Sequence, residues 1–215
     1  MSKIICRNLS KSTCRLQPTA LAAVNLSMPY ISTIFAISLL VSVGSSTLIT
    51  YYLGRNEKQI SNEIFTKNII IITLLGLFLS FISLFLLDEI ALFLGATEET
   101  FIYVKEYLGI IIPSSIFFML AYSLEVLVKA DGFPIYSIIF VTLSAFTNIV
   151  LDYIFVICFD FGVRGAAIAT AASQFISFLG FLLHFVFGRS NLKFVKPNIK
   201  LKYIKRISIG FPEFL

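Results

Sequence analysis

The sequence predicts an all-α membrane protein, a polytopic bundle of five complete transmembrane helices followed by the start of a sixth. Two observations predict this fold class. Of the 215 residues, 58% are hydrophobic and 13% are charged, against about 25% charged residues in soluble domains. The apolar residues also form long continuous runs, unlike the alternating stretches of about ten residues in a transmembrane β-barrel. Lipid is therefore the expected solvent of this chain.

The apolar runs are long enough to cross a bilayer, which takes about 20 residues. The predicted spans lie at about 26–53, 68–87, 107–128, 134–159 and 165–187. Three segments outside them are set apart: an atypical N-terminal segment at 1–18, a basic linker at 189–206, and the start of the next helix at 207–215. The bundle itself occupies 19–188, and no domain boundary is visible within it.

Basic residues orient the predicted spans. Eleven of them lie in the segments 54–67, 129–133 and 189–206, whereas the loops on the opposite side hold only Lys105 and Arg164. Loops rich in Lys and Arg face the cytoplasm, so we expect a multi-pass protein of the cell (plasma) membrane with 189–206 on the cytoplasmic side. The four basic residues before residue 20 then fall on the opposite side. This conflict predicts an incomplete protein that lacks a helix before residue 21.

Polar side chains form a stripe on the fourth predicted span. Ser144, Asn148 and Asp152 are spaced four residues apart, so they lie on one helix face. Thr170 and Gln174 repeat this spacing on the fifth span. Because a short turn joins the two antiparallel spans, Asp152 is expected level with Thr170, and Asn148 level with Gln174.

The chemistry of Asp152 remains open between two interpretations. The residue lies about six residues, or ~9 Å, inside its span, and ionisable groups at such depth are functional candidates. A carboxylate beside an amide and a hydroxyl is suited to bind Na⁺ or to take up and release a proton. In the alternative, Asp152 only holds the helix pair together by hydrogen bonds. No resident cofactor is expected, and no metal beyond Na⁺ at Asp152.

Three other features have structural interpretations. Glu125 and Lys129, spaced i and i+4 near the end of the third span, are expected to form an ion pair, although Glu125 is also a candidate cavity residue, as are Ser144 and Gln174. We interpret His184 as an interfacial polar residue rather than a proton relay. The run GAAIATAAS at 165–173 predicts close helix packing.

Several classes of function are excluded by what the sequence lacks. It contains no G-x-x-x-x-G-K-[ST] loop, no G-x-G-x-x-G motif and only one histidine, so an enzyme is not expected. Nucleic acid is not an expected partner either, because the basic residues lie at the ends of apolar runs and form no stripe.

Four stretches of this chain resemble the multidrug and toxic compound extrusion (MATE) family of antiporters, over residues 16–215. They resemble, in order, the join between that family's first and second helices, the loop between its fourth and fifth, the fifth and sixth helices, and the opening of the seventh. The stretches are TALAAVNLSMP at 19–29, VKADGFP at 128–134, NIVLDYIFV with GVRGAAIATAASQ at 148–174, and IGFPEF at 209–214.

The resemblance implies a fold and a function. Such antiporters pair two six-helix bundles and exchange Na⁺ or H⁺ for bulky, often cationic, drugs, so the five spans correspond to helices two to six of the N-terminal bundle. Membrane lipid and small cationic organic molecules are the implied partners. In some members an Asn and an Asp on the fifth helix and a Thr on the sixth bind the coupling cation. These match Asn148, Asp152 and Thr170 here, and Tyr107 matches a tyrosine on the fourth helix.

The chain also departs from that family. It supplies no first-helix aspartate, residues 1–15 resemble no part of the family, and a second, C-terminal bundle is absent. The sequence therefore predicts an N-terminal-half fragment that is inactive alone although its parent is an antiporter. Two alternatives are a non-transporting membrane scaffold and a lipid-linked oligosaccharide flippase of a related fold. The absence of Lys or Arg from the middle of the spans speaks against the flippase.

Overall fold

A computed structural model of the chain describes residues 13–188 and 190–196, with side chains from Thr19 onward. These residues form helices and no strand, which confirms the all-α fold class. The elements are α2 (Thr13–Gly54), α3 (Lys58–Phe85), α4 (Leu87–Phe93), α5 (Phe101–Ala130), α6 (Pro134–Asp152), the π-helix η1 (Tyr153–Cys158) and α7 (Gly162–Phe187).

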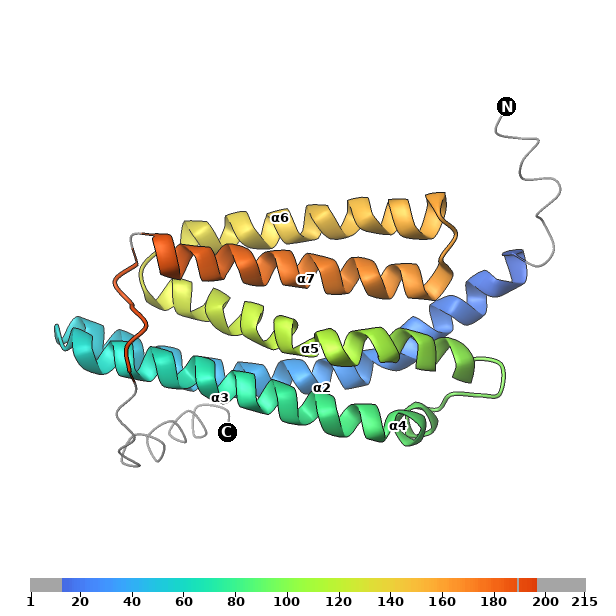
Figure 1. The fold of residues 1–215 in the computed structure, drawn as a ribbon, viewed down its shortest axis with the longest axis horizontal. Coiled ribbons are helices and arrows are strands. Elements are labelled where there is room, and N and C mark those ends of the chain that lie inside the picture. Colours follow the sequence, from blue (N-terminus) through green and yellow to red (C-terminus); the bar gives the residue numbers. More distant parts are fainter. Residues whose placement is uncertain (1–12, 189, 197–215) are drawn as a thin grey trace.

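Five helical segments of the described chain are long and apolar enough to cross a membrane, as predicted. Figure 1 shows them running side by side, with α6 and α7 on one side of α5 and with α2 and α3 on the other. Four of these helices, α2, α3, α5 and α7, begin earlier than the predicted spans because the residues that flank the apolar runs are helical too, whereas α6 begins at Pro134 as predicted. Lys67, which we expected in a loop, lies inside α3, where it forms an ion pair of 3.8 Å with Glu63.

The first spanning helix, α2, differs from the prediction at its start. It is continuous from Thr13 through 19–29, a stretch that we expected at a join between two helices. The helix passes through Pro29 without a break, as transmembrane helices tolerate proline. The last residues of the segment 1–18 are thus part of the bundle's first helix.

The central helix of the bundle is α5. It contacts α2, α3, α6 and α7, and half of its spanning window is buried inside the protein. Leu108, Ile112, Met119 and Leu124 are each at most 1% exposed and belong to successive clusters of the core along its length. The other helices are therefore positioned mainly by their packing against α5.

The small residues of α7 permit a close approach to η1, the helix that precedes it in the sequence. Gly165 is buried, and a Cβ atom there would lie 3.0 Å from the carbonyl oxygen of Phe155. Ala167 and Ala169 are fully buried on the same helix. The expectation of close packing over 165–173 is therefore met at these positions.

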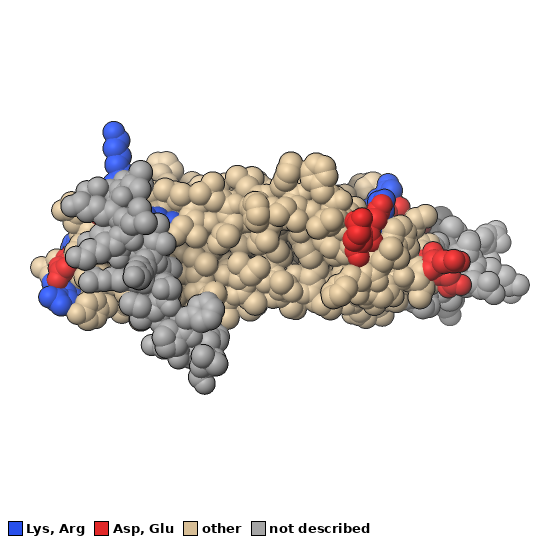
Figure 2. All heavy atoms as spheres, turned by 90° about the horizontal axis from the view of Figure 1, so that it is seen from below, with Lys and Arg blue, Asp and Glu red and all other residues tan. Residues whose placement is uncertain are grey.

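Charged side chains gather at the two ends of the bundle. Figure 2 shows Lys, Arg, Asp and Glu toward each end of one face, with an uncharged band between them. We name the end with the α2–α3 loop and the α5–α6 turn the basic end, and the end with α4 and the α6–α7 turn the acidic end. In the described residues, the basic side chains of the basic end are Arg55, Lys58, Lys67, Lys129, Lys193 and Lys196, and the acidic side chains of the acidic end are Asp88, Glu89, Glu98, Glu99, Glu106 and Asp160.

A short segment after α7, residues 190–196, crosses the basic end toward α3 (Figure 1), and we name it the strap. Its Leu192 is fully buried in the core. The backbone N–H of Lys193 donates to Asn62 Oδ1 at 2.9 Å, and that of Val195 donates to Thr66 Oγ1 at 3.1 Å. The strap is thus fixed to α3. Arg189 and residues 197–215, including most of the predicted linker and the predicted next helix, lie outside the described residues.

The other anchor of the strap is Asp131 in the α5–α6 turn, a residue only 4% exposed. Its carboxylate accepts hydrogen bonds from the Ser190 hydroxyl at 2.7 Å and from the Asn191 backbone N–H at 3.2 Å. Burial raises the pKa of Asp131 above its ordinary value of 3.8, although these hydrogen bonds and the nearby His184 act in the opposite direction.

Candidate functional site

The polar residues predicted on the fourth span lie along one face of α6. Ser144 is 8% exposed and donates a hydrogen bond of 2.9 Å to the carbonyl oxygen of Ser173 on α7. Asn148 and Asp152 follow at intervals of four residues and are half-buried. Exposed apolar side chains such as Ile138 and Phe146 cover other faces of the same helix. The sequence of α6 therefore turns its polar face inward and leaves apolar faces for lipid.

A cavity of about 280 Å³ lies between α5, α6 and α7. This volume is well above the ~10–15 Å³ that a single water needs. We name it the polar cavity. Its polar lining residues are Tyr122, Glu125, Ser144, Asn148, Thr170, Ser173, Gln174 and Ser177. Five of these, Glu125, Ser144, Asn148, Thr170 and Gln174, are site residues predicted from the sequence.

Asp152 lies with Tyr107 and Thr170 where three helices meet. Tyr107 on α5 is 4% exposed, and its hydroxyl interacts with the side chain of Thr170 on α7 and with the charge of Asp152 on α6. The Oδ1 atom of Asp152 is buried and has no hydrogen-bond partner among the described residues. A buried carboxylate oxygen without a partner is costly, so this atom is suited to hold a proton or a cation.

Glu125 marks the part of the polar cavity nearest the basic end. Its Oε1 accepts a hydrogen bond from Lys129 Nζ at 2.6 Å and one from the Ser137 hydroxyl at 3.3 Å. The expected ion pair with Lys129 is therefore present, and Glu125 is a cavity residue as well.

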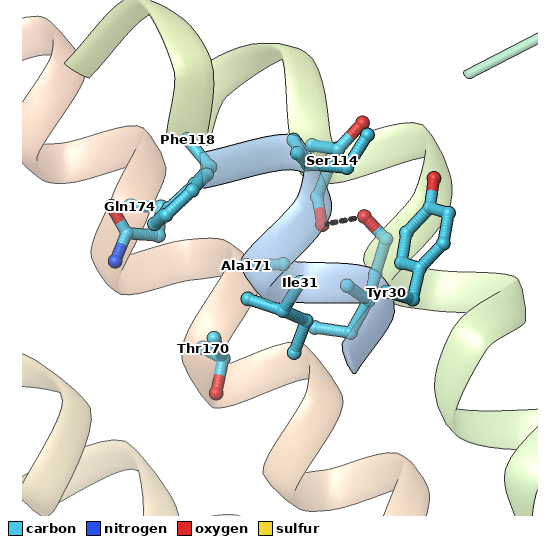
Figure 3. Close-up of a pocket in the computed structure, with 10 residues that line it drawn as sticks. Tyr30, Ile31, Ser114, Phe118, Thr170, Ala171 and Gln174 are labelled. Carbon is cyan, nitrogen blue, oxygen red and sulfur yellow. Dashed lines mark hydrogen bonds between the residues drawn. The ribbon is translucent and has the colours of Figure 1, made fainter. Parts of the chain in front are cut away.

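A second, smaller cavity of about 70 Å³ lies between α2, α5 and α7, and Figure 3 shows its lining. Thr170, Gln174 and Phe118 line both cavities, so these side chains form the partition between them. Tyr30 and Ser114 line only the smaller one, and the sequence analysis did not find them. The spacing of Ser114, Phe118 and Glu125 along one helix face is a signal that could have indicated α5 as a wall.

His184 lies in the last turn of α7, near the basic end, and is only 6% exposed. Its ring packs against Tyr136 at 4.6 Å and against Phe133 at 5.5 Å between ring centroids. Helix packing at the basic end encloses the ring, which sequence position alone did not reveal.

The geometry defines an oxygen-rich site with one carboxylate. Among the described residues, no group of three or more His, Cys, Asp or Glu side chains could hold a metal ion. Hydroxyl, amide and single carboxylate oxygens are hard ligands for a small cation, and their low total charge is compatible with a monovalent one. The oxygens of this site are thus of the type that suits Na⁺, and the carboxylate of Asp152 is of the type that suits a proton.

Together, the fold and the site define a multi-pass membrane protein whose helical bundle encloses a polar cavity, an architecture typical of secondary transporters. A family model described as MatE matches residues 10–154. The chain belongs to this family. The match begins inside the segment 1–15 that we expected to resemble no part of the family, and α2 begins there as well.

The chain is similar to known multidrug transporters. It is 33% identical over 199 residues to the multidrug export protein MepA of Staphylococcus aureus, covering 91% of this chain and 44% of the relative. Two solved structures of a multidrug resistance MATE family transporter of the MOP superfamily, one inward-facing and one outward-facing, each align with 25% identity, a TM-score of 0.85 and coverage of 91% of this chain. The alignments cover 45% and 44% of those chains. The chain therefore spans less than half the length of these relatives, which are transporters and not enzymes.

Proposed function

We propose that this bundle is part of a secondary active multidrug exporter that exchanges Na⁺ or H⁺ for small cationic organic molecules. Membership of the MatE family and the similarity to a multidrug export protein support the class of transport. Asp152, Asn148, Thr170 and Tyr107 form the proposed coupling-cation or proton site. The basic end is proposed to face the cytoplasm, and the chain to reside in the plasma membrane.

The observation that carries the proposal is the buried Oδ1 atom of Asp152, which lacks a hydrogen-bond partner among the described residues. A structural aspartate would be expected to use its oxygens in hydrogen bonds, since unpaired buried acceptors cost free energy. A proton on this carboxylate, or a cation against it, removes that cost. Binding therefore changes the charge inside the membrane by one unit at a place where three helices meet.

Each neighbouring residue has a distinct part in this proposal. Thr170 and Asn148 supply neutral oxygen ligands to a cation that enters from the polar cavity, of which both are lining residues. Tyr107 closes the site on the α5 side, because its hydroxyl interacts with Thr170 and its ring is buried. Export itself is proposed to need the greater length of the relatives, because alternating access requires two bodies that move against each other.

Cation binding by the purified chain in lipid nanodiscs tests the proposal directly. Radioactive Na⁺ binding and the infrared signal of a protonated carboxyl group are measured for the chain and for Asp152→Asn. Either the Na⁺ binding or the carboxyl signal is expected to be lost in this variant. Loss of Na⁺ binding would identify Na⁺ as the coupling ion, and loss of the carboxyl signal would identify H⁺. Asp160→Asn, an exposed aspartate in the α6–α7 turn, is the matched control and is expected to change neither. If Asp152→Asn changes neither quantity, Asp152 is structural and the scaffold alternative stands.

The flippase alternative has no support in the cavities. Neither the polar cavity nor the smaller cavity is lined by Lys or Arg, which a pyrophosphate-linked substrate would be expected to require.

A resistance assay addresses export. An efflux-deficient host expressing the 215-residue chain alone is expected to remain drug-sensitive, and resistance in that host would contradict the need for a second bundle.

A further inference from the structure

A layer of buried polar side chains interrupts the apolar core that α2, α3 and α5 share. The core cluster nearer the basic end includes residues of all three helices, among them Ile49, Phe65 and Leu124. The next cluster toward the acidic end does so as well, with Ile34, Ile72 and Met119. Between the two clusters lie Ser42 and Ser45 on α2, Asn68 on α3 and Ser123 on α5, each of them 0% exposed. We name these four residues the serine–asparagine layer.

One contact between α2 and α5 fixes the level of two members of this layer. The Ser38 hydroxyl donates to the carbonyl oxygen of Met119 at 3.1 Å. The two helices run in the same direction (Figure 1), and Ser42 and Ser123 each lie four residues further along. Residues four apart share a helix face, so Ser42 faces α5 level with Ser123.

A second contact, between α2 and α3, gives the same level independently. The Ser61 hydroxyl lies 3.5 Å from the carbonyl oxygen of Ile49. Because α3 runs opposite to α2, Asn68 is level with Ser42, seven residues from this contact on either helix. The Asn68 Nδ2 atom also donates to the Ser123 Oγ atom at 2.7 Å. Three helices therefore bring their polar side chains to one place in the core.

Three atoms of the layer have no hydrogen-bond partner among the described residues, namely Ser42 Oγ, Ser45 Oγ and Asn68 Oδ1. Other buried serines of the same helices do have partners. Ser38 and Ser115 donate to backbone carbonyl oxygens at 3.1 and 2.7 Å. Since each buried polar group without a partner costs free energy, three such atoms in one layer indicate a ligand that they share.

The chemistry of these atoms favours a neutral ligand that both donates and accepts hydrogen bonds. The two serine hydroxyls carry O–H donors, whereas Asn68 Oδ1 can only accept. A water molecule satisfies both kinds of group and makes about three hydrogen bonds in a protein interior. The layer contains no carboxylate that could neutralise a cation. Lys67 and Glu63, the charged residues nearest to Asn68 in sequence, pair with each other at 3.8 Å.

We propose that the serine–asparagine layer binds an ordered water molecule that joins α2 to α3 and α5. The water donates to Asn68 Oδ1 and forms its other hydrogen bonds with the Ser42 and Ser45 hydroxyls. It is a structural ligand that holds α2 in register with its two neighbours. The site is separate from Asp152, which lies on α6, and it does not rest on the proposed function.

A crystal structure of the full chain, grown in a lipid phase, tests for the water directly. The expected result is a density peak about 2.6–3.2 Å from Asn68 Oδ1 and from at least one of the two serine hydroxyls. A second crystal soaked in Rb⁺, whose anomalous scattering marks monovalent-cation sites, is expected to show no anomalous peak there. A layer without density, or a layer with an anomalous peak, overturns the inference.

Alanine variants distinguish a layer bridged by water from one without a ligand. Ser42→Ala and Ser45→Ala each deprive the water of a partner, and each is expected to lower the midpoint of thermal unfolding by about 2–4 °C. Without a ligand, the same variants would remove a costly unpaired hydroxyl and would raise the midpoint or leave it unchanged. The matched control is Ser46→Ala, because the Ser46 hydroxyl donates within its own helix to the Val43 carbonyl oxygen at 2.9 Å. Its change is expected to be the smallest of the three.

A midpoint that is unchanged or raised in both Ser42→Ala and Ser45→Ala overturns the inference. If neither variant folds, the crystal structure decides alone. Failure of Asp152 to bind Na⁺ or H⁺ would leave the density and both midpoints as expected. The loss of the water would likewise leave the ion site on α6 intact, so the two failures are distinguishable.

Discussion

The spanning segments of α5 and of α6 with η1 have the same mean hydropathy, yet half of the first is buried in the protein and only 6% of the second. Helix α5 contacts all the other spanning helices, whereas α6 packs mainly on α7. Equal hydropathy predicts that both helices cross a membrane, but it does not distinguish a central scaffold helix from a wall. The few polar residues of each helix make that distinction, since those of α6 face a cavity.

The largest expected effect is on stability, at the central helix α5. Leu108→Ala on α5 removes a fully buried side chain and is expected to lower the free energy of unfolding by about 2–5 kcal/mol. Ile138→Ala on α6, at a position 67% exposed, is expected to change it by less than about 0.5 kcal/mol. Thermal unfolding of both variants in the same detergent measures the difference. Equal losses would remove the distinction between the two helices.

A smaller difference is expected between two buried hydroxyl groups. Ser123→Ala on α5 leaves the buried Asn68 amide without its hydrogen bond of 2.7 Å and is expected to cost about 1–3 kcal/mol. Ser144→Ala on α6 removes a bond to a helical carbonyl oxygen and is expected to cost about 0.5–1.5 kcal/mol. Chemical denaturation of both variants tests the order, and a larger loss for Ser144→Ala would contradict it.

The turn between the two helices is expected to respond to pH through Asp131. Burial raises the pKa of Asp131 above 3.8 while the strap is docked on it. The protonated carboxyl group therefore favours docking, and this contribution is complete below pH 3.8. That contribution decreases as the pH rises through the pKa of the docked state. Hydrogen exchange at Leu192 and Lys193 is therefore expected to be slower at acidic pH after correction for the intrinsic rate. Asp131→Asn is expected to remove this pH dependence, and its persistence would assign the effect to another group.

The smallest effect is expected at the acidic end, where Arg164 on α7 pairs with Glu106 on α5 at 2.9 Å. The Arg164 side chain is 63% exposed, so Arg164→Gln is expected to cost less than about 1 kcal/mol. The same measurement in high salt is expected to show no difference from the unmodified chain. A larger, salt-independent cost would mean that the acidic end also holds the helices together.

The sequence predicted the features that local spacing determines. The five spans follow from apolar runs that are long enough to cross a lipid bilayer. The grouping of Asp152 with Thr170, and of Asn148 with Gln174, follows from a short turn that fixes the register of two antiparallel helices. Tyr107 came from the family resemblance, because nothing in its own helix distinguishes it from other tyrosines.

The features that were missed depend on packing between distant segments. The smaller cavity, with Tyr30 and Ser114, requires α2 beside α5 and α7, and sequence spacing carries no information on that neighbour. The burial of His184 depends on the α5–α6 turn, which supplies Phe133, and on Tyr136 at the start of α6. The π-helix after Asp152 is likewise invisible in composition. It lengthens one helix turn at the point where the polar face of α6 ends.

The strap has a mechanical consequence for the whole bundle. Residues 190–196 carry the chain from the end of α7 across to α3, with attachments at Asp131, Asn62 and Thr66. A pull applied at residue 196 is therefore borne first by α3 and by the α5–α6 turn, and reaches α7 only after those attachments open. The force therefore passes into α3 and the α5–α6 turn, while α7, which is continuous with the strap in sequence, is shielded from strain.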